Sequence, residues 1–593
     1  MRKLFIVTFF ILTYQLLTAQ STNEWLTFYE KSNYLETPNY NESIEYCKKL
    51  DKASPFISYY SFGVSHEGRE LPLLVVSNEK NYSPALQRKS KKALIMIQCG
   101  IHAGEIDGKD AMLMLVRDIV INKKYPDLLN NVNLLIIPIF NVDGHEKISP
   151  YNRINQNGPK EMGWRVNALN LNLNRDYLKA ETIEMKSWLK LFNEWMPDFF
   201  IDCHVSDGAD WPYTAMYEAE KNQNINKEIG EWTKEHLLPY VLSGCEKAGH
   251  PLIPYVAFMD EFDITKGILS GIMPPKLSTG YTAARNRQGF LIETHSYKDY
   301  KTRVDATYQI CRIIIELIND KEYSRLKKIN KAADEETKNC FTSIESFPLS
   351  YKTGDKSVTT DFRIYKMIKE KSGISGSDKR YYDNSKEERY QIPYYNTVEP
   401  AKAIKPPFGY IIPKQLNFVV DILKLHNVTV KEFTHDEVLD VQTYRLTNPS
   451  WREKPYEGRH LVSYGSEIVK MKMSIKKGSY FIPVNQQAAK VIMHLLEPLS
   501  NESLISWGFM DAIFEQKEYA EQYVLEKFAL QIYNENEKIR DEFDQKVKND
   551  SAFAANPRER LNYFYKKLPY WDNNIGLYPI YRINEKVNLK INN

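Results

Sequence analysis

Two histidines and two glutamates follow short apolar runs of the sequence, and side chains of these types can act together on one metal ion. His102 and Glu105 lie three residues apart, directly after one run, while His204 and Glu293 each end another. An imidazole and a carboxylate suit Zn²⁺, which needs three protein ligands and an open fourth position to be catalytic. Three strand ends would therefore bring two His and two Glu side chains toward a zinc site.

Each of these signals also has an ordinary structural explanation. An HxxE pair occurs by chance in many chains of this length, as a loop histidine beside a solvated glutamate. His204 on its own is equally well explained as a buried structural histidine. The four residues support a metal site only if the fold brings the three strand ends together.

Apolar runs that alternate with helical patterns predict such a fold. The expected strands cover 93–99, 132–140, 199–203 and 289–292, and the expected helices lie at 110–120, 181–196, 221–240 and 303–335. This rhythm predicts an α/β fold with a mixed, mostly parallel sheet flanked by helices. Open α/β sheets of this kind place their sites at the carboxyl ends of the strands.

The first residues have the order of a secretory signal. Arg2 and Lys3 precede an apolar run, 4–17, which is followed by small residues before Gln20. We predict a signal peptide at 1–19 and export to the periplasm or the outside of the cell. A membrane anchor is the alternative, but the run is shorter than the about 20 apolar residues that a spanning helix needs. We therefore expect no stable membrane span after signal removal.

The composition is that of a globular protein. The chain has 593 residues, of which 43% are hydrophobic and 26% charged, so wholesale disorder and a polytopic membrane protein are excluded. The formal net charge of +3 offers no electrostatic reason to expect nucleic acid as a partner. Six cysteines without CxxC spacing leave disulfide pairing open, and the oligomeric state is equally open.

The second half of the chain differs in character from the first. After a catalytic domain at 22–335, we expect an α+β accessory region at 340–480 and a mainly helical region at 481–593. Residues 371–400, rich in Ser, Lys, Tyr, Asp and Gly, are interpreted as a loop or a domain seam.

Several motifs in sequence order make the chain similar to one known family. The motifs are Gly63-Val-Ser-His-Glu-Gly-Arg-Glu-Leu71, His102-Ala-Gly-Glu105, Asn141-Val-Asp-Gly144, Trp164-Arg165, Asn174-Arg175, His204 and Glu293. Over residues 50–300 the chain resembles the zinc carboxypeptidases of the funnelin (M14) type. Any one of these short matches carries little weight, but seven matches in the correct order identify the chain as a member of that family.

The resemblance implies a ligand set and a base. His102, Glu105 and His204 would bind one Zn²⁺ per chain, and Glu293 would act as general base and acid on the water that zinc activates. Arg165 would stabilise the oxyanion of the scissile carbonyl, with Arg153 as the competing candidate.

The resemblance also implies how a substrate is held. Asn174 and Arg175 would bind the α-carboxylate of the substrate's C-terminal residue, because a planar guanidinium can pair with both oxygens. Tyr281 is a candidate for the family's mobile substrate-binding tyrosine, and an ordinary packing tyrosine is the alternative.

Two positions depart from the family pattern. Asn172 stands where digestive members carry an aspartate that orients a zinc-binding histidine; an asparagine can still accept through its oxygen, but it brings no charge. Gly104 replaces a bulky basic residue within the HxxE motif, which we expect to open the cleft.

Three functional hypotheses follow. The leading one is an exported zinc carboxypeptidase that removes C-terminal amino acids from peptides with a free C-terminal carboxylate. The alternative is a zinc amidohydrolase or peptidase that acts on peptidoglycan stem peptides or N-acyl amino acids, which also carry a free carboxylate. The third is a catalytically inactive binding module, against which the intact ligand set argues.

The segments 507–519 and 568–571 resemble long bacterial members of the family with an accessory region of unassigned role.

Overall fold

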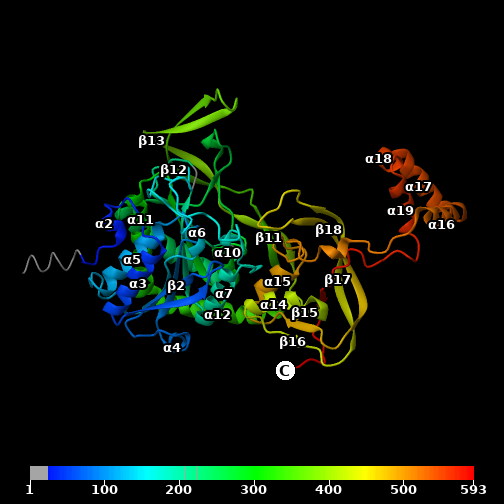
Figure 1. Ribbon diagram of the computed structural model, residues 1–593, viewed down its shortest axis with the longest axis horizontal. Coiled ribbons are helices and arrows are strands. Elements are labelled where there is room, and N and C mark those ends of the chain that lie inside the picture. The colour runs from blue at the N-terminus through cyan, green and yellow to red at the C-terminus, as the bar shows by residue number, and fades with distance from the viewer. Residues whose placement is uncertain (1–23, 207–208, 222–223, 593) are drawn as a thin grey trace, which may run out of the picture.

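The computed structural model describes residues 24–206, 209–221 and 224–592. The predicted signal peptide, 1–19, lies outside the described residues. Within them, the first half of the chain forms an eight-stranded sheet with the strand order β1-β2-β4-β3-β5-β10-β6-β7. Figure 1 shows this half of the chain in blue to green. The strands are β1 (Ile57–Val64), β2 (Glu70–Val76), β3 (Ala93–Cys99), β4 (Val132–Ile137), β5 (Phe199–Ser206), β6 (Ala215–Ala219), β7 (Leu252–Pro254) and β10 (Gln288–His295).

The centre of this sheet is parallel. Strand β3 pairs in parallel with both β4 and β5, and β5 pairs in parallel with β10, whereas β1, β2 and β6 pair with a neighbour in the antiparallel sense. The prediction of a mixed, mostly parallel sheet is confirmed. Because β3, β5 and β10 run in the same direction, their carboxyl ends lie at one edge of the sheet.

Helices cover both faces of the sheet, which explains why its central strands are continuous apolar runs. Along β3, Ile95 and Ile97 point into one core and Leu94 and Met96 into the other, as the two-residue period of a strand requires. The first core is formed with α3 (Tyr40–Ala53), α5 (Asp107–Val120), α9 (Leu238–Lys247), α11 (Tyr300–Leu317) and α12 (Tyr323–Lys338). The second core is formed with α7 (Ile183–Trp195), α10 (Ser278–Ala284), α14 (Asn417–Leu425) and α15 (Ala489–Leu496).

This part of the chain also contains shorter helices. They are α2 (Phe28–Lys31), α4 (Pro84–Lys89), α6 (Val142–His145), α8 (Lys227–Trp232) and α13 (Cys340–Ser343). Because α14 and α15 belong to the second half of the chain, the second core is continuous across both halves. The C-terminal region is therefore packed on the sheet domain through buried apolar side chains.

The segment interpreted as a loop or seam at 371–400 is mostly a β-hairpin, so that interpretation is wrong. Strand β12 (Val358–Lys371) pairs with β13 (Asp378–Tyr395), and β13 continues onto β9 (Ile268–Leu269), which pairs with β8 (Ala257–Phe258). Phe362 and Ile392 at its base pack in a cluster with side chains of the first half. Beyond the base both faces are largely polar, so the sequence lacks the alternation that marks a half-buried strand.

The second half of the chain contains a six-stranded sheet in the order β16-β19-β15-β20-β17-β18 among the described residues. The strands are β15 (Gly409–Ile412), β16 (Lys431–Glu432), β17 (Glu437–Trp451), β18 (Val462–Ile475), β19 (Tyr480–Pro483) and β20 (Tyr581–Ile583), and β11 (Phe347–Thr353) pairs with β14 (Val398–Ile404) beside it. Strand β20, close to the end of the chain, pairs with β15. The boundary that we placed between 340–480 and 481–593 therefore separates strands that pair with each other.

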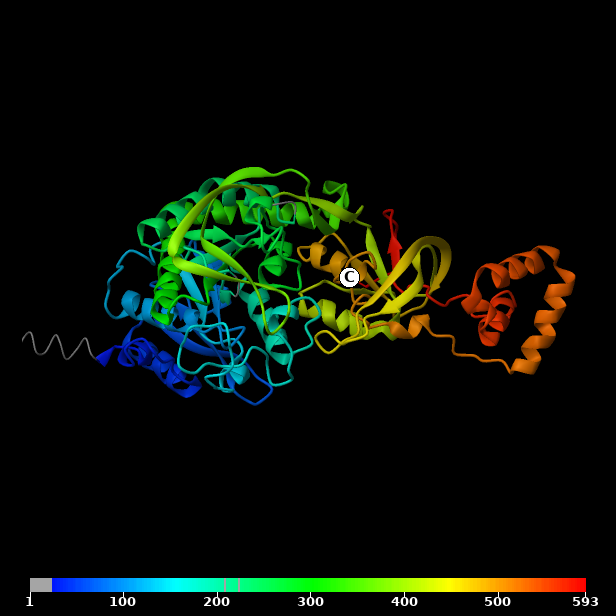
Figure 2. The ribbon, with the colours of Figure 1, turned by 90° about the horizontal axis from the view of Figure 1, so that it is seen from above.

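Four helices near the C-terminus form a unit with its own small core. They are α16 (Gln522–Glu535), α17 (Glu537–Asn549), α18 (Ser551–Ala554) and α19 (Pro557–Tyr565). Both ribbon views place them at the end of the molecule far from the first sheet (Figures 1 and 2). Over the part of the chain that the structure describes, no helix combines the length and the apolar character needed to cross a membrane.

Candidate metal centre and active site

The chain turns sharply after β3, and this turn delivers the first two candidate ligands. Gly100 adopts a positive φ of 64°, a conformation that side-chain-bearing residues rarely adopt. The backbone N–H groups of Phe140 and Asn141 donate to the carbonyls of Cys99 and Gly100, so the loop is tied to the neighbouring strand end. His102 and Glu105 follow within this loop, before α5 begins.

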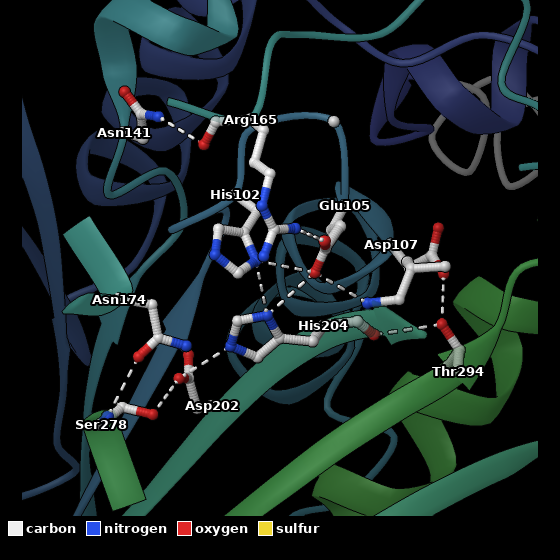
Figure 3. Close-up of polar contacts among 12 residues, drawn as sticks. His102, Glu105, Asp107, Asn141, Arg165, Asn174, Asp202, His204, Ser278 and Thr294 are labelled. Atoms are coloured by element: carbon white, nitrogen blue, oxygen red, sulfur yellow. Dashed lines mark hydrogen bonds and ion pairs between the residues drawn. The ribbon is translucent and has the colours of Figure 1, made fainter. Parts of the chain in front are cut away.

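His204 comes from β5 and reaches the same point (Figure 3). Its Nδ1 lies 2.9 Å from Glu105 Oε2 and 3.2 Å from His102 Nδ1, and His102 Nδ1 is 3.2 Å from the same Glu105 oxygen. All three side chains are buried, and one ligand atom of each lies within 4.8 Å of the others. The structure thus brings together the three residues predicted as zinc ligands.

Neighbouring residues decide which ring nitrogens carry protons. His102 Nε2 lies 3.0 Å from Asn172 Oδ1, and His204 Nε2 lies 2.9 Å from a carboxylate oxygen of Asp202. Both partners are acceptors, so the protons belong on Nε2 and the Nδ1 lone pairs face Glu105. The Asn172 oxygen also accepts from the N–H of Asn174, which fixes the orientation of the amide. The expectation that Asn172 accepts through its oxygen is confirmed.

This arrangement fits a cation. Two imidazole lone pairs and a carboxylate oxygen within 3.2 Å of one another repel unless positive charge lies between them. Burial lowers the pKa of His102 to about 4, which keeps its ring neutral and able to bind a metal. Burial also disfavours charge on His204, but the Asp202 and Glu105 carboxylates raise its pKa well above the usual value, so the pocket favours positive charge.

Glu105 is held ionised by two arginines. Arg153 and Arg165 each donate from Nη1 to Glu105 Oε1 at 2.9 Å, and the Val205 N–H donates to Oε2. Burial alone would raise the pKa of Glu105, yet His102 and Arg153 hold it well below the usual range. A deprotonated carboxylate is the form that binds a metal.

Arg165 and Arg153 differ in how they are placed. The side chain of Arg165 is 43% exposed, and its backbone carbonyl accepts from Asn141 Nδ2 at 3.3 Å (Figure 3). Arg153 is only 11% exposed. Arg165 is therefore the better placed of the two to contact a substrate, whereas Arg153 forms part of the wall of the pocket around Glu105.

The expectation that Gly104 opens the cleft is wrong. A Cβ atom at Gly104 would lie 2.6 Å from Arg153 Cδ and 2.7 Å from the carbonyl oxygen of Gly163. The space next to Gly104 is already filled by the stem of an arginine from another loop. That arginine lies 49 positions further along the chain, so local sequence could not reveal it.

Glu293 stands beside His204 at the end of β10. The two residues are paired in register between parallel strands, and Glu293 is partly exposed while its neighbours in the strand are buried. Burial, together with the charges of Glu105 and Asp202, raises the pKa of the Glu293 carboxyl to about 8. A metal cation in the pocket would lower this value.

The predicted carboxylate-binding pair lies in a short 3₁₀ turn, Leu173–Arg175. Asn174 Oδ1 accepts from the N–H of Ser278 at 3.1 Å, which leaves its amide nitrogen as a donor. Arg175 donates from Nη1 to the carbonyl of Asn174 at 2.6 Å and from Nε to the hydroxyl of Tyr456 at 3.0 Å.

The structure does not bring Tyr281 to the site, so the substrate-binding prediction for this residue is wrong. Tyr281 is fully buried in α10, and its hydroxyl lies 2.9 Å from His426 Nδ1 and accepts from Arg285 at 3.0 Å. It belongs to the core shared with the C-terminal region, as a packing tyrosine.

Sequence reasoning missed Asp202, which is fully buried and also accepts from the hydroxyl of Ser278 at 2.5 Å and from Gln98 Nε2 at 2.9 Å. Its signal was present: Asp202 precedes His204 by two positions, and side chains two apart on a strand share a face.

Comparison with known proteins agrees with the geometry. Residues 43–186 match the family model described as zinc carboxypeptidase, a stretch that contains His102 and Glu105 and ends before His204. The chain therefore carries a zinc carboxypeptidase (M14) domain. The family supports metallocarboxypeptidase activity and implies Zn²⁺, and the His102, Glu105 and His204 group is where the structure can hold the ion.

Several curated relatives share more than this domain. Carboxypeptidase 2 of Trichophyton rubrum is 23% identical over 507 residues, covering 80% of this chain and 84% of that protein. An alignment of this length extends well into the C-terminal half. Carboxypeptidase Z of Gallus gallus is 28% identical over 149 residues, which is 23% of this chain and 21% of that protein. An inactive metallocarboxypeptidase of Saccharomyces cerevisiae is 25% identical over 242 residues, covering 35% of this chain and 55% of that protein.

Among solved structures, carboxypeptidase A of Helicoverpa armigera is 17% identical with a TM-score of 0.36, covering 50% of this chain and 74% of that chain. The family assignment depends on the sequence matches.

Proposed function

We propose that this protein is an exported zinc carboxypeptidase that removes C-terminal amino acids from peptides. The observation that carries the proposal is the convergence of His102, Glu105 and His204, with Glu293 in register beside His204. This arrangement offers three metal ligands and one further carboxylate next to them. It is the minimum that hydrolysis with a metal-activated water requires.

Bound Zn²⁺ would supply a Lewis acid and a water whose pKa is lowered to about 7. Glu293 accepts a proton from water at its carboxylate and passes it to the amine of the leaving residue. Arg165, with its half-exposed guanidinium above the ligands, stabilises negative charge on the scissile carbonyl oxygen.

Asn174 and Arg175 select the chain end. Arg175 retains donor hydrogens beyond those given to Tyr456 and Asn174, because a guanidinium carries five. A free α-carboxylate can pair with these donors, whereas an amide offers one oxygen and no charge. We therefore infer that peptides with a free C-terminus are preferred.

The test uses pairs of peptides that differ only in a free or an amidated C-terminus, incubated with the zinc-loaded full-length protein. We expect single residues to be released from the free-ended peptides only. A Glu293→Gln variant should bind zinc normally and lose 10²- to 10⁴-fold in kcat, as expected for a general base. Glu161→Gln, at an exposed carboxylate of the same domain, serves as the control. Equal cleavage of both peptide forms would disprove the carboxypeptidase proposal.

Two further classes of substrate distinguish the alternative function, a zinc amidohydrolase or peptidase of narrower specificity, from the carboxypeptidase function. Stem-peptide fragments of peptidoglycan and N-acyl amino acids are offered at the same concentrations. If either is hydrolysed much faster than ordinary peptides, the protein is an amidohydrolase or a peptidase of that narrower class. If none of these substrates is hydrolysed in the presence of bound zinc, the protein is a binding module.

Export is proposed from the N-terminal sequence pattern alone. The expected outcome is a secreted or periplasmic protein whose first residue is Gln20, measured by N-terminal sequencing after expression of the complete chain in a bacterial host. Recovery of the chain with Met1 intact, inside the cell, would refute this part of the proposal.

A further inference from the structure

The C-terminal region reaches the candidate active site through the end of one hairpin. Between β17 and β18 the chain continues as a narrow loop, in which Tyr456 and Arg459 exchange backbone hydrogen bonds of 2.8 and 3.1 Å. The two residues between them, Glu457 and Gly458, have positive φ values of 50° and 75°. This is the backbone of a tight two-residue hairpin turn. We call residues 456–459 the hairpin turn.

Three side chains of the hairpin turn contact the catalytic domain. Tyr456 accepts from Arg175 Nε at 3.0 Å, and Glu457 accepts from the backbone N–H of Asn172 at 2.8 Å. Arg459 donates to the Glu181 carboxylate at 2.5 Å. Two of the three contacts therefore involve residues next to the metal ligands or in the predicted carboxylate site.

The C-terminal region itself fixes the position of Tyr456. Its ring stacks on Trp507 with centroids 5.9 Å apart and planes inclined by 28°. Lys276 lies 6.0 Å from the ring centroid and forms an ion pair of 2.9 Å with Glu502. The buried Trp507 therefore packs against the Tyr456 ring, and the Tyr456 hydroxyl points to Arg175.

The Tyr456 hydroxyl can still donate a hydrogen bond while it accepts one from Arg175. A phenol that accepts a hydrogen bond through an oxygen lone pair still carries its own proton. The group beside it, Arg175, is the one that would pair with the α-carboxylate of a substrate. Tyr281, the tyrosine predicted for this task, is buried elsewhere. A carboxylate paired with the guanidinium would lie next to the hydroxyl of Tyr456.

We propose that Tyr456 is a substrate-positioning residue supplied by the C-terminal region. Its hydroxyl donates to the α-carboxylate that Arg175 binds, so Tyr456 forms one wall of the subsite for the C-terminal residue of the peptide. This inference rests on the proposed carboxypeptidase function. It gives the C-terminal region, which has no other assigned role here, a part in substrate recognition.

The alternative is that the hairpin turn only holds the two regions together. A Tyr456→Phe variant separates the two roles, because phenylalanine keeps the stacking on Trp507 and loses only the hydroxyl. Arg459→Gln is the matched docking control, since it removes the ion pair with Glu181 but lies outside the carboxylate site.

The readout is the ratio of affinities for an N-acetyl amino acid and its amide, measured by calorimetry on the zinc-loaded full-length protein, together with KM and kcat for a free-ended peptide. For Tyr456→Phe we expect the acid-to-amide ratio to fall about tenfold, the loss of one hydrogen bond to a charged group, with a matching rise in KM and little change in kcat. For Arg459→Gln the ratio should stay at the wild-type value even if the melting temperature falls.

Each outcome decides the matter. An unchanged ratio in Tyr456→Phe, with a wild-type protein that prefers the acid, overturns the role of Tyr456 and leaves the carboxypeptidase proposal intact. A parallel loss of both affinities in both variants shows a docking role only and also overturns it. A wild-type protein that binds acid and amide equally overturns the carboxylate site itself, and this inference with it.

Discussion

Replacing Asp202 by asparagine should weaken zinc binding without disturbing the fold. Asp202 is fully buried, and its carboxylate oxygens accept from His204, Ser278 and Gln98. Asparagine has nearly the same shape but turns one oxygen into a donor. The Gln98 amide can reverse to meet that donor, because both its oxygen and its nitrogen lie within 3.2 Å of the Tyr177 hydroxyl. The substitution therefore removes charge and little else.

The magnitude follows from the hydrogen bond between Asp202 and His204, which is 2.9 Å long. A hydrogen bond to a charged group contributes about 1.5–3 kcal/mol and a neutral one about 0.5–1.5 kcal/mol. The midpoints of these ranges differ by about 1.25 kcal/mol, which corresponds to a roughly eightfold weaker affinity. Loss of a group that orients a metal-binding histidine typically costs about 10- to 100-fold, which agrees.

The assay is competition for zinc between the protein and a chromophoric chelator, on wild type and Asp202→Asn at equal concentration. The melting temperature of the metal-free proteins is measured beside it to show that the fold is kept. Asp198→Asn is the control, because Asp198 lies just before the opposite end of β5, where it accepts from the N–H of Leu94. Equal zinc affinities for Asp202→Asn and wild type would refute the argument that Asp202 polarises His204.

Three further changes test other parts of the site and fold. Asn172→Asp places a charge beside His102 Nε2 and should tighten zinc binding about tenfold in the same competition assay. Gly144→Ala puts a Cβ 2.6 Å from the backbone carbonyls of the two residues that flank Arg165, so we expect a cost of about 1–3 kcal/mol and a lower kcat at unchanged zinc content. Burial raises the pKa of Glu218 to about 8, so its favourable contribution to folding is present below the unfolded value near 4.3 and is lost as the pH rises through 8. Glu218→Gln should match wild type near pH 4 and exceed its stability by about 5 kcal/mol at pH 8.5, measured by thermal unfolding.

Each of these predictions has a contradicting result, and two of them have a matched control variant. Gly373→Ala lies at a hairpin position where a Cβ would meet nothing within 4 Å, so it should leave both stability and kcat unchanged. If Gly144→Ala also left both unchanged, the loop would have adapted to the added Cβ. Glu235→Gln, at an exposed site, serves as the control, and a pH profile of Glu218→Gln that runs parallel to that of wild type would contradict the raised pKa of Glu218. Weaker zinc binding by Asn172→Asp would mean that the neighbouring Glu457 repels the new charge.

The central strands were within reach of the sequence through local pattern, and the candidate metal ligands through their positions at strand ends together with the family resemblance. A strand buried on both faces must be a continuous apolar run, so β3, β5 and β10 were visible as such. His102, Glu105 and His204 stand directly at strand ends, where spacing alone determines which edge of the sheet they occupy. Asp202 was also accessible, through its two-residue spacing from His204.

Other features were out of reach because they depend on residues far apart in the chain. The space beside Gly104 is filled by Arg153, and the polar hairpin β12–β13 is stabilised at its base by packing on the first half. A tyrosine near Glu293 was the natural candidate for substrate binding on sequence order, yet Tyr281 turns inward because the C-terminal region supplies the core that it packs against.

The sequence by itself indicated the class of chemistry, since the residue types at strand ends and the motifs that carry the family resemblance are properties of short segments. Only the tertiary structure decided what surrounds that chemistry. Tyr456 and Arg175 are 281 positions apart, and no local pattern relates them. They meet because α14 and α15 pack on the sheet domain and carry the hairpin turn to the site, so the buried apolar interface between the two halves determines which polar side chains face the substrate.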